Sequence, residues 1–213
     1  MLAINDAGWL SGANVITAPC KHYSALLGKK PEGIVWHYTN TAHGTAATMA
    51  RSLQNKDKAQ SSYHLAIESD GTIYQSVSLL KGAWHAGSST AQKFKRVNGV
   101  LTKSNTGVSA NRFAVGIEFV NVGRVKNVDG VWRGWPYTNK GPAAYEVVTV
   151  GKNTWHTFTA AQIKAGHDLL ELLVKHYGMT ANTKLTHAEL DPTRREDPGP
   201  LWVQHLNELE RCA

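Results

Sequence analysis

Short apolar runs separated by turn residues predict several strands in the first part of the chain. A mostly apolar run at 34–38 follows a proline and a glycine, which is typical of a buried strand. A second run of this kind spans 113–120. The segments 63–68 and 72–75 flank a Ser-Asp-Gly turn and predict a β-hairpin.

Helical patterns lie between and after these strands. Apolar residues recur at helical spacing over 45–55. The strongest helix signal starts at 159–162, which fits a capping box, and ends at Gly178. A short strand near 184–186 and a helix from about Leu201 close the chain. Strands interleaved with helices favour an α/β fold with a central mixed β-sheet flanked by helices.

Residues 122–157 follow a different pattern. An Asp-Gly turn predicts a hairpin over 125–133, and a second apolar stretch at 145–150 ends at a glycine. We therefore expect a β-rich insertion. Its aromatic residues are Trp132, Trp135, Tyr137 and Trp155. They fit either contacts with glycan rings and peptide stems or the small core that such a hairpin needs.

The composition is that of a folded protein. Of 213 residues, 42% are hydrophobic and 18% charged, so we expect a single domain over 1–213 that buries a core. The net charge of +7 indicates an anionic partner such as nucleic acid, a membrane surface or the bacterial cell wall. Four basic residues are expected to form a charged, solvated loop: Lys93, Lys95, Arg96 and Lys103.

Two cysteines, Cys20 and Cys212, lie near opposite ends of the chain. They are too few for a disulfide framework or a four-thiolate zinc site, and the sequence leaves open whether they pair. The first residues lack a basic region followed by an apolar run, which predicts no signal peptide and synthesis in the cytoplasm. No segment has the roughly 20 apolar residues of a membrane helix, so we expect no stable membrane insertion.

Three side chains that can bind metal stand at the ends of predicted elements. His37 lies in the first apolar run, His187 follows the strand near 184–186, and Asp197 comes ten positions later. Two imidazoles and one carboxylate, with a fourth position left for water, form a recurrent catalytic zinc set. Two of the three also have a structural interpretation, whereas His187 has none that is comparable. His37 fits a buried core histidine, and Asp197 before Pro198 fits a helix N-cap.

The sequence around these residues contains motifs in a fixed order. They are Val35-Trp36-His37-Tyr38-Thr39, Ser62-Tyr63-His64-Leu65 with Asp70-Gly71-Thr72-Ile73, Ala83-Trp84-His85-Ala86-Gly87, Val115-Gly116-Ile117-Glu118, and Thr186-His187-Ala188-Glu189 running into Asp197-Pro198-Gly199-Pro200. In these motifs, over about 33–205, the chain resembles the zinc-dependent N-acetylmuramoyl-L-alanine amidases of the type 2 family. That family includes small phage endolysins, bacterial anhydro-muropeptide amidases and peptidoglycan recognition proteins.

The resemblance implies a set of zinc ligands and a substrate groove. His37, His187 and Asp197 stand where the family holds Zn²⁺, although some members have a cysteine at the third position. His85 and Trp84 lie in a family motif and are candidates for the wall of the groove. The alternatives are that His85 braces a loop and that Trp84 packs in the core.

The resemblance also implies residues that move protons or stabilise charge. Tyr63 matches a tyrosine that acts near the metal in phage enzymes, and Glu118 matches a catalytic glutamate. Arg195 stands where many catalytic members carry lysine. Arginine can donate hydrogen bonds to an oxyanion but does not shuttle protons, so proton transfer would fall to Glu118 or Tyr63. His64 is expected to face away from Tyr63 and to be structural.

The function implied by the resemblance is zinc-dependent hydrolysis of the amide bond between N-acetylmuramic acid and L-alanine in peptidoglycan. A basic catalytic domain without an export signal fits a phage endolysin that acts as a monomer on the cell wall in the periplasm. A muropeptide-recycling amidase or a secreted antibacterial effector fits the same residues. Two other classes are a non-catalytic peptidoglycan-binding module and a basic nucleic-acid binder. The complete ligand set disfavours the first, and the lack of a matching motif disfavours the second.

Overall fold

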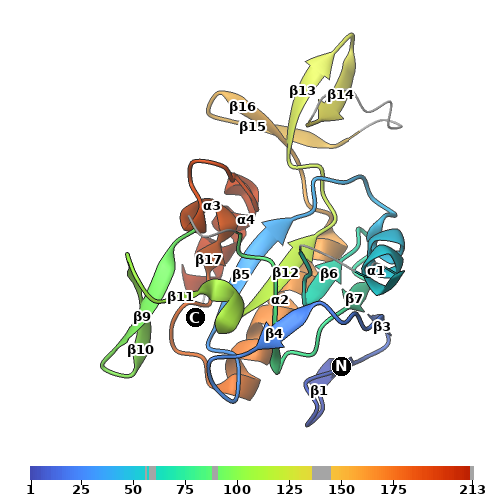
Figure 1. Ribbon diagram of the computed structural model, residues 1–213. Helices are drawn as coiled ribbons and strands as arrows, with labels where there is room; N and C mark the ends of the chain where they lie inside the picture. The colour runs from blue at the N-terminus through green and yellow to red at the C-terminus, as the bar shows by residue number, and fades with distance from the viewer. Residues whose placement is uncertain (56, 58–60, 88–90, 136–144, 212–213) are drawn as a thin grey trace.

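The centre of the protein is a six-stranded mixed sheet. The structure, a computed structural model, describes residues 1–55, 57, 61–87, 91–135 and 145–211. The strand order is β17-β5-β12-β6-β7-β3. These strands span Leu185–Thr186 (β17), Gly33–Tyr38 (β5), Ala114–Phe119 (β12), Leu65–Ile67 (β6), Ile73–Gln75 (β7) and Val15–Thr17 (β3). The first four are mutually parallel, and β7 is antiparallel to β6, which confirms the predicted mixed sheet (Figure 1).

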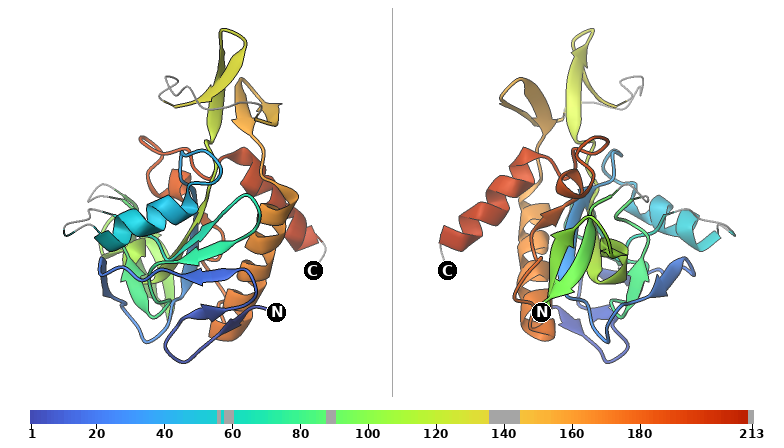
Figure 2. Two further views of the ribbon diagram at one scale, coloured as in Figure 1. Left: turned by 90° about the vertical axis from the view of Figure 1, so that its right-hand side faces the viewer. Right: turned by 60° about the vertical axis from the view of Figure 1, so that its left-hand side comes forward.

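One face of this sheet carries the main core. Alternate positions of β5 and β12 point their side chains to this face, among them Trp36 and Phe119, which are fully buried. They pack against Trp202, whose ring centroid lies 4.9 Å from that of Trp36 and 4.4 Å from that of Phe119. Helices α2 (Ala160–Tyr177) and α4 (Pro200–Arg211) cover this side, as Figure 2 shows. The opposite face is therefore the one left for polar chemistry.

The ends of α2 agree with the sequence prediction. The Thr159 side chain accepts a hydrogen bond from the Gln162 backbone, and the Gln162 side chain accepts one from the Thr159 backbone. Gly178 ends the helix in the left-handed conformation that favours glycine. The shorter helix α1 (Ala46–Asn55) packs over the other face of the sheet, where its Leu53 joins a cluster with Ala66 of β6.

The predicted insertion forms a sheet of its own, which stands above the central sheet in Figure 1. Its strands are β13 (Arg124–Val128), β14 (Val131–Gly134), β15 (Val147–Val150) and β16 (Asn153–His156), in the antiparallel order β14-β13-β16-β15. Trp155 is buried against Gly199 of the main body, whereas Trp135 is 61% exposed. Tyr137 lies outside the described residues.

The prediction of a loop over the basic residues was wrong. The basic segment 93–103 is a hairpin of β9 (Lys93–Val97) and β10 (Val100–Ser104), not a loop. Its register places Phe94 and Leu101 on one face, where both are buried, whereas Lys95, Arg96 and Lys103 are exposed. An Asn-Gly pair with positive φ at both residues makes the turn.

The remaining elements are short and were not predicted from the sequence. They are β1 (Ala3–Ile4), β2 (Leu10–Ser11), β4 (Tyr23–Ala25), β8 (Lys81–Ala83), β11 (Val108–Ser109), the 3-10 helix η1 (Ala110–Arg112) and α3 (His187–Leu190). Within the described part of the chain, no helix is both long and apolar enough to span a membrane. Cys20 is buried and forms no disulfide within the described residues, and Cys212 lies outside them.

Candidate metal centre and active site

The candidate site lies where the parallel strands end. His37, near the end of β5, pairs in register with Glu118 of β12. Thr186 of β17 pairs with Trp36, so His187, the next residue, comes level with His37. Side chains at the same level of neighbouring parallel strands share a face. The sheet register therefore brings together three polar residues that are far apart in the sequence.

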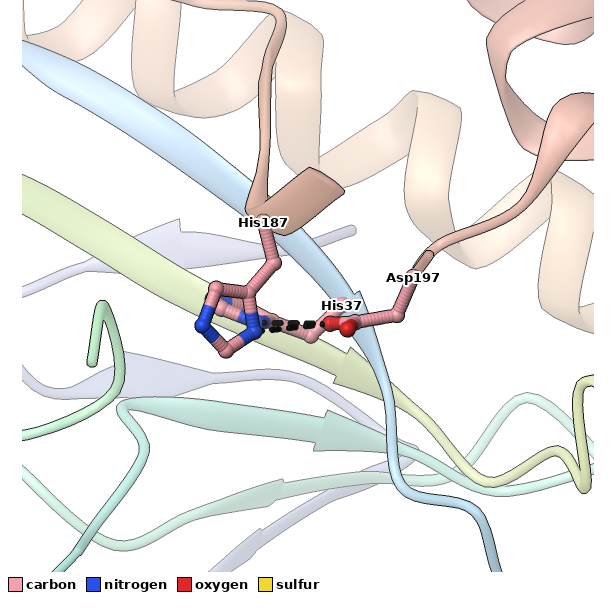
Figure 3. Close-up of side chains that lie close together, drawn as sticks. All are labelled: His37, His187 and Asp197. Atoms are coloured by element: carbon pink, nitrogen blue, oxygen red, sulfur yellow. Dashed lines mark hydrogen bonds and ion pairs between the residues drawn. The ribbon is translucent and has the colours of Figure 1, made fainter. Parts of the chain in front are cut away.

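His37, His187 and Asp197 converge on one point (Figure 3). The His37 Nδ1 atom lies 3.0 Å from His187 Nδ1 and 3.1 Å from Asp197 Oδ2, and the last two atoms are 3.0 Å apart. The three residues are buried, with exposed fractions of 1%, 5% and 7%. Ligand atoms around a tetrahedral zinc ion stand about 3.3 Å apart, so a small shift would accommodate the ion.

Local structure positions His187 and Asp197, the two candidate ligands near the C-terminal end of the chain. His187 is the first residue of α3, whose capping box joins Thr186 to Glu189. The Ala188 backbone N–H donates to the Asp197 carbonyl at 2.9 Å, which ties the loop carrying Asp197 to this helix. Because α4 begins only at Pro200, the interpretation of Asp197 as the cap of that helix was wrong.

The electrostatics of the three residues suit a divalent cation. Burial lowers the pKa of His37 to about 4, so its imidazole is neutral at physiological pH. Burial by itself would raise the pKa of Asp197, but its close contacts with His187 and His37 outweigh burial and hold the pKa of this carboxyl below its ordinary value, so it stays ionised. Neutral imidazole nitrogens and a carboxylate oxygen are the donors that zinc prefers. The residues present therefore fit a zinc ion.

Glu118 lies beside this centre in an unusual environment. Burial raises the pKa of Glu118 to about 8, and the negative charge of Asp197 acts in the same direction. The positive charge of Arg195 opposes both effects. A carboxyl group whose pKa lies near neutrality can both accept and return a proton, which is the property of a general acid–base residue.

Tyr63 and Arg195 border the same space. Tyr63 is buried, and burial raises the pKa of its hydroxyl to about 12, so the hydroxyl keeps its proton and can donate a hydrogen bond. Arg195 is exposed at the rim, and its charge acts on both Glu118 and His37. Both residues line one groove with the three metal-capable side chains.

This groove has a volume of about 1100 Å³. One wall is helix α1, which contributes Thr48 and Met49 among others, and the opposite wall is the loop 192–196. Trp84 also lines it, with its indole N–H bound to Ser24 Oγ at 2.8 Å. Trp135 of the insertion also lines it. The sequence did not show that the insertion borders the site, because nothing local to 122–157 encodes where its sheet lies.

The other histidines of the motifs lie deeper. His64 is fully buried and bound by backbone groups on both sides of its ring, since its Nδ1 accepts from Gly116 N–H at 2.9 Å and its Nε2 lies 2.8 Å from the Lys81 carbonyl. These contacts give it the structural role expected. His85 lies directly behind His37, with its Nδ1 atom 3.0 Å from His37 Nε2.

A second set of contacts, missed from the sequence, joins the insertion to the site. Glu196, next to Asp197, accepts a hydrogen bond from the Tyr38 hydroxyl at 3.2 Å and pairs with Arg124 of β13 at 3.3 Å. Gly123 has a positive φ and lies against the Tyr38 ring, where a Cβ atom would collide. These contacts fix the base of the insertion beside the loop that carries Asp197.

Comparisons with known proteins agree with this architecture. No curated protein sequence matches the chain. Among solved structures, a selenomethionine derivative of AmpD is 22% identical with a TM-score of 0.55, covering 96% of this chain and 98% of that one. AmiD from E. coli, solved with anhydro-N-acetylmuramic acid-L-Ala-D-γ-Glu-L-Lys, is 20% identical with a TM-score of 0.54 over 96% of this chain and 65% of its own. The catalytic domain of XlyA is 22% identical with a TM-score of 0.51, covering 93% and 96%.

At these identities, the structural likeness shows a shared fold. The sequence gives the more specific result, because the family model described as N-acetylmuramoyl-L-alanine amidase (Amidase_2) matches residues 27–200, which is most of the chain. That match includes both histidines and the aspartate of the candidate metal centre. The chain therefore belongs to the N-acetylmuramoyl-L-alanine amidase family.

Proposed function

We propose that this protein is a zinc-dependent amidase that cleaves the bond between N-acetylmuramic acid and L-alanine in peptidoglycan. The observation that carries the proposal is the convergence of His37, His187 and Asp197 within 3.1 Å at the bottom of a groove. Membership of the amidase family supports it. A zinc ion held by these residues would polarise the scissile carbonyl and lower the pKa of a water molecule toward about 7.

The chain's own side chains supply the remaining steps. Glu118 takes a proton from the attacking water and returns it to the nitrogen of the leaving L-alanine, which its raised pKa favours. Arg195 donates hydrogen bonds to the oxyanion that forms on the carbonyl oxygen. Its guanidinium does not give up a proton near neutral pH, so it does not replace a lysine as a shuttle. Tyr63 donates its hydroxyl hydrogen bond to orient the water or the substrate.

The groove suits a muropeptide rather than a small molecule. Its volume of about 1100 Å³ is at the upper end of ligand pockets, and its walls are rich in hydroxyl and basic groups. AmiD, which shares the fold, is solved with an anhydro-muropeptide. We assign Trp84 to the wall that contacts the substrate, and we infer that the net charge of +7 favours anionic cell wall.

The biological setting that we favour is that of a phage endolysin, with residues 1–213 as a single monomeric catalytic domain that reaches the cell wall from the cytoplasm. A muropeptide-recycling amidase and a secreted antibacterial effector have the same chemistry. Parallel assays with intact sacculi and with soluble anhydro-muropeptides separate these settings. Faster release from sacculi supports the endolysin, and turnover restricted to anhydro-muropeptides supports the recycling enzyme.

The central test is the release of stem peptides from purified peptidoglycan. Wild-type protein should expose new amino termini on L-alanine, EDTA should stop the release, and added zinc should restore it. His187→Ala should release none. If the wild-type protein sediments with peptidoglycan but never releases peptides under any zinc condition, the protein is a binding module and the amidase proposal is wrong.

A further inference from the structure

His85 is built into the floor of the site from several directions. The residue is 7% exposed, and its ring lies edge-on to those of His37 and His64, at centroid distances of 5.1 and 5.7 Å. The Asn111 side-chain oxygen accepts hydrogen bonds from the backbone N–H groups of His85 and Ala86 at 2.9 and 2.6 Å. The ring of His85 is thus held by both packing and backbone anchoring.

The position of the ring depends on a glycine in the neighbouring strand. A Cβ atom on Gly116 would come within 2.4 to 2.7 Å of three atoms of the His85 ring. Gly116 precedes Glu118 by two positions, on the same face of β12, directly below the candidate site. The absence of a side chain there lets the imidazole lie against the strand and reach His37.

The hydrogen bonds of His85 have a defined direction. Its Nε2 atom lies 3.2 Å from the Ala114 carbonyl oxygen, which can only accept, so Nε2 carries the proton. In a neutral imidazole the other nitrogen is then an acceptor. The Nδ1 atom of His85 faces His37 Nε2 at 3.0 Å, so it accepts the N–H of His37. His37 is left with a lone pair on Nδ1, which points at Asp197 and His187.

The contacts that run from Asp197 through His37 and His85 to Ala114 are one proton short. Between the Asp197 carboxylate and the Ala114 carbonyl there are three successive contacts, through both nitrogens of His37 and both nitrogens of His85. Two neutral imidazoles carry only two protons, so one contact must bring two acceptors together. A cation bound between His37 Nδ1 and Asp197 removes this conflict and leaves every other contact with a proton.

We infer that His85 is a positioning residue, which holds His37 with its proton on Nε2 and thereby presents the Nδ1 lone pair to the metal. This inference rests on the zinc site of the proposed function. His85 differs from a carboxylate in this position. Its own hydrogen bond ends on the neutral Ala114 carbonyl, so it adds no negative charge behind His37. His187 has no equivalent, since its Nε2 atom lacks a hydrogen-bond partner within the described residues.

The test compares two isosteric substitutions, His85→Asn and His85→Leu. Asparagine and leucine have the same branched shape, so both leave the same space where the ring was. Only asparagine places an oxygen where imidazole Nδ1 stood, facing His37. Zinc affinity is measured by competition with a chromogenic chelator, without any hydrolysis assay. We expect His85→Leu to weaken zinc binding about 10- to 100-fold and His85→Asn to recover most of that loss. His176→Leu, which removes an exposed imidazole on α2, should leave the affinity unchanged.

A second measurement needs no variant. In zinc-loaded wild-type protein, ¹⁵N NMR of the imidazoles should show a proton on Nε2 of both His37 and His85. A proton on Nδ1 of His85, or equal zinc affinities for His85→Asn and His85→Leu, overturns the inference. If the wild-type protein releases no peptide but His85→Leu binds zinc more weakly than His85→Asn, only the amidase proposal is wrong. If the wild-type protein releases peptide and the two variants bind zinc equally, only the role of His85 is wrong.

Discussion

Glu118 stands directly across from His37 on the neighbouring parallel strand. One side chain is a candidate metal ligand and the other is the proposed acid–base group, and the pairing of β5 with β12 sets them level on one face of the sheet. A shift of the register by one residue would turn Glu118 toward the apolar core. The relation of the two groups is therefore fixed by the most central strand pair of the protein.

Replacing Glu118 with glutamine should remove proton transfer while keeping the shape of the side chain. We expect peptide release to fall by about 10²- to 10⁴-fold. Zinc affinity, measured by chelator competition, should stay within a few-fold of wild type, because Glu118 is not among the converging ligands. Turnover close to the wild-type rate would assign proton transfer to another residue, with Tyr63 as the first candidate.

The same substitution should stabilise the metal-free protein at alkaline pH. The folded-state pKa of Glu118, about 8, lies above its ordinary value of 4.5, so ionisation favours the unfolded chain. The resulting destabilisation is absent below about pH 4.5 and grows as the pH rises through 8. Glu118→Gln should match wild type near pH 4.5 and exceed it at pH 8.5 by on the order of a few kcal/mol, or about 2–4 °C in Tm per kcal/mol.

Thermal unfolding in EDTA across this pH range provides the measurement. Glu171→Gln, which removes an exposed carboxylate on α2, serves as the control and should follow the wild-type curve. A Glu118→Gln curve that runs parallel to wild type at every pH would show that Glu118 does not titrate with a raised pKa in the folded protein.

Removing the metal should lower stability only when the ligand set is complete. A ligand that binds the folded state alone stabilises it, so EDTA should lower the Tm of the zinc-loaded wild-type protein. Asp197→Asn keeps the side-chain shape but removes the negative charge, and we expect EDTA to change its Tm little. Asp168→Asn, which removes a carboxylate paired with Lys164 on the surface of α2, should respond to EDTA as wild type does.

Substitutions of Arg195 test whether the positive charge of its guanidinium is required for catalysis. Arg195→Ala should reduce kcat by about 10²- to 10³-fold if its guanidinium stabilises the oxyanion. Arg195→Lys should recover part of this rate, because the positive charge remains. Lys175→Ala, which removes an exposed positive charge from α2, should leave kcat unchanged. A full rate in Arg195→Ala would exclude this role.

Gly116→Ala should disturb the floor of the site without touching a proposed ligand. The added Cβ collides with the His85 ring, so either the ring or the strand must move. We expect a loss of about 1–3 kcal/mol in the free energy of unfolding, together with weaker zinc binding. Gly28→Ala, where the nearest atom lies at 3.4 Å, should alter neither quantity. Denaturant unfolding and chelator competition measure the two effects.

Features set by neighbouring residues were readable from the sequence by itself. The capping box at Thr159, the stop at Gly178 and the apolar runs of β5 and β12 each depend on hydrogen bonds or periodicity within a few residues. The family resemblance identified the candidate ligands for a similar reason, because each motif is contiguous in the chain.

Only the tertiary structure decided which distant segments meet. It paired β3 with the edge of the central sheet, turned the basic segment 93–103 into a hairpin over buried Phe94 and Leu101, and set the insertion beside the groove. The contact of His85 with His37 and the raised pKa of Glu118 belong to the same class. Such features arise from burial and packing between elements far apart in sequence, and no local pattern of residues encodes them.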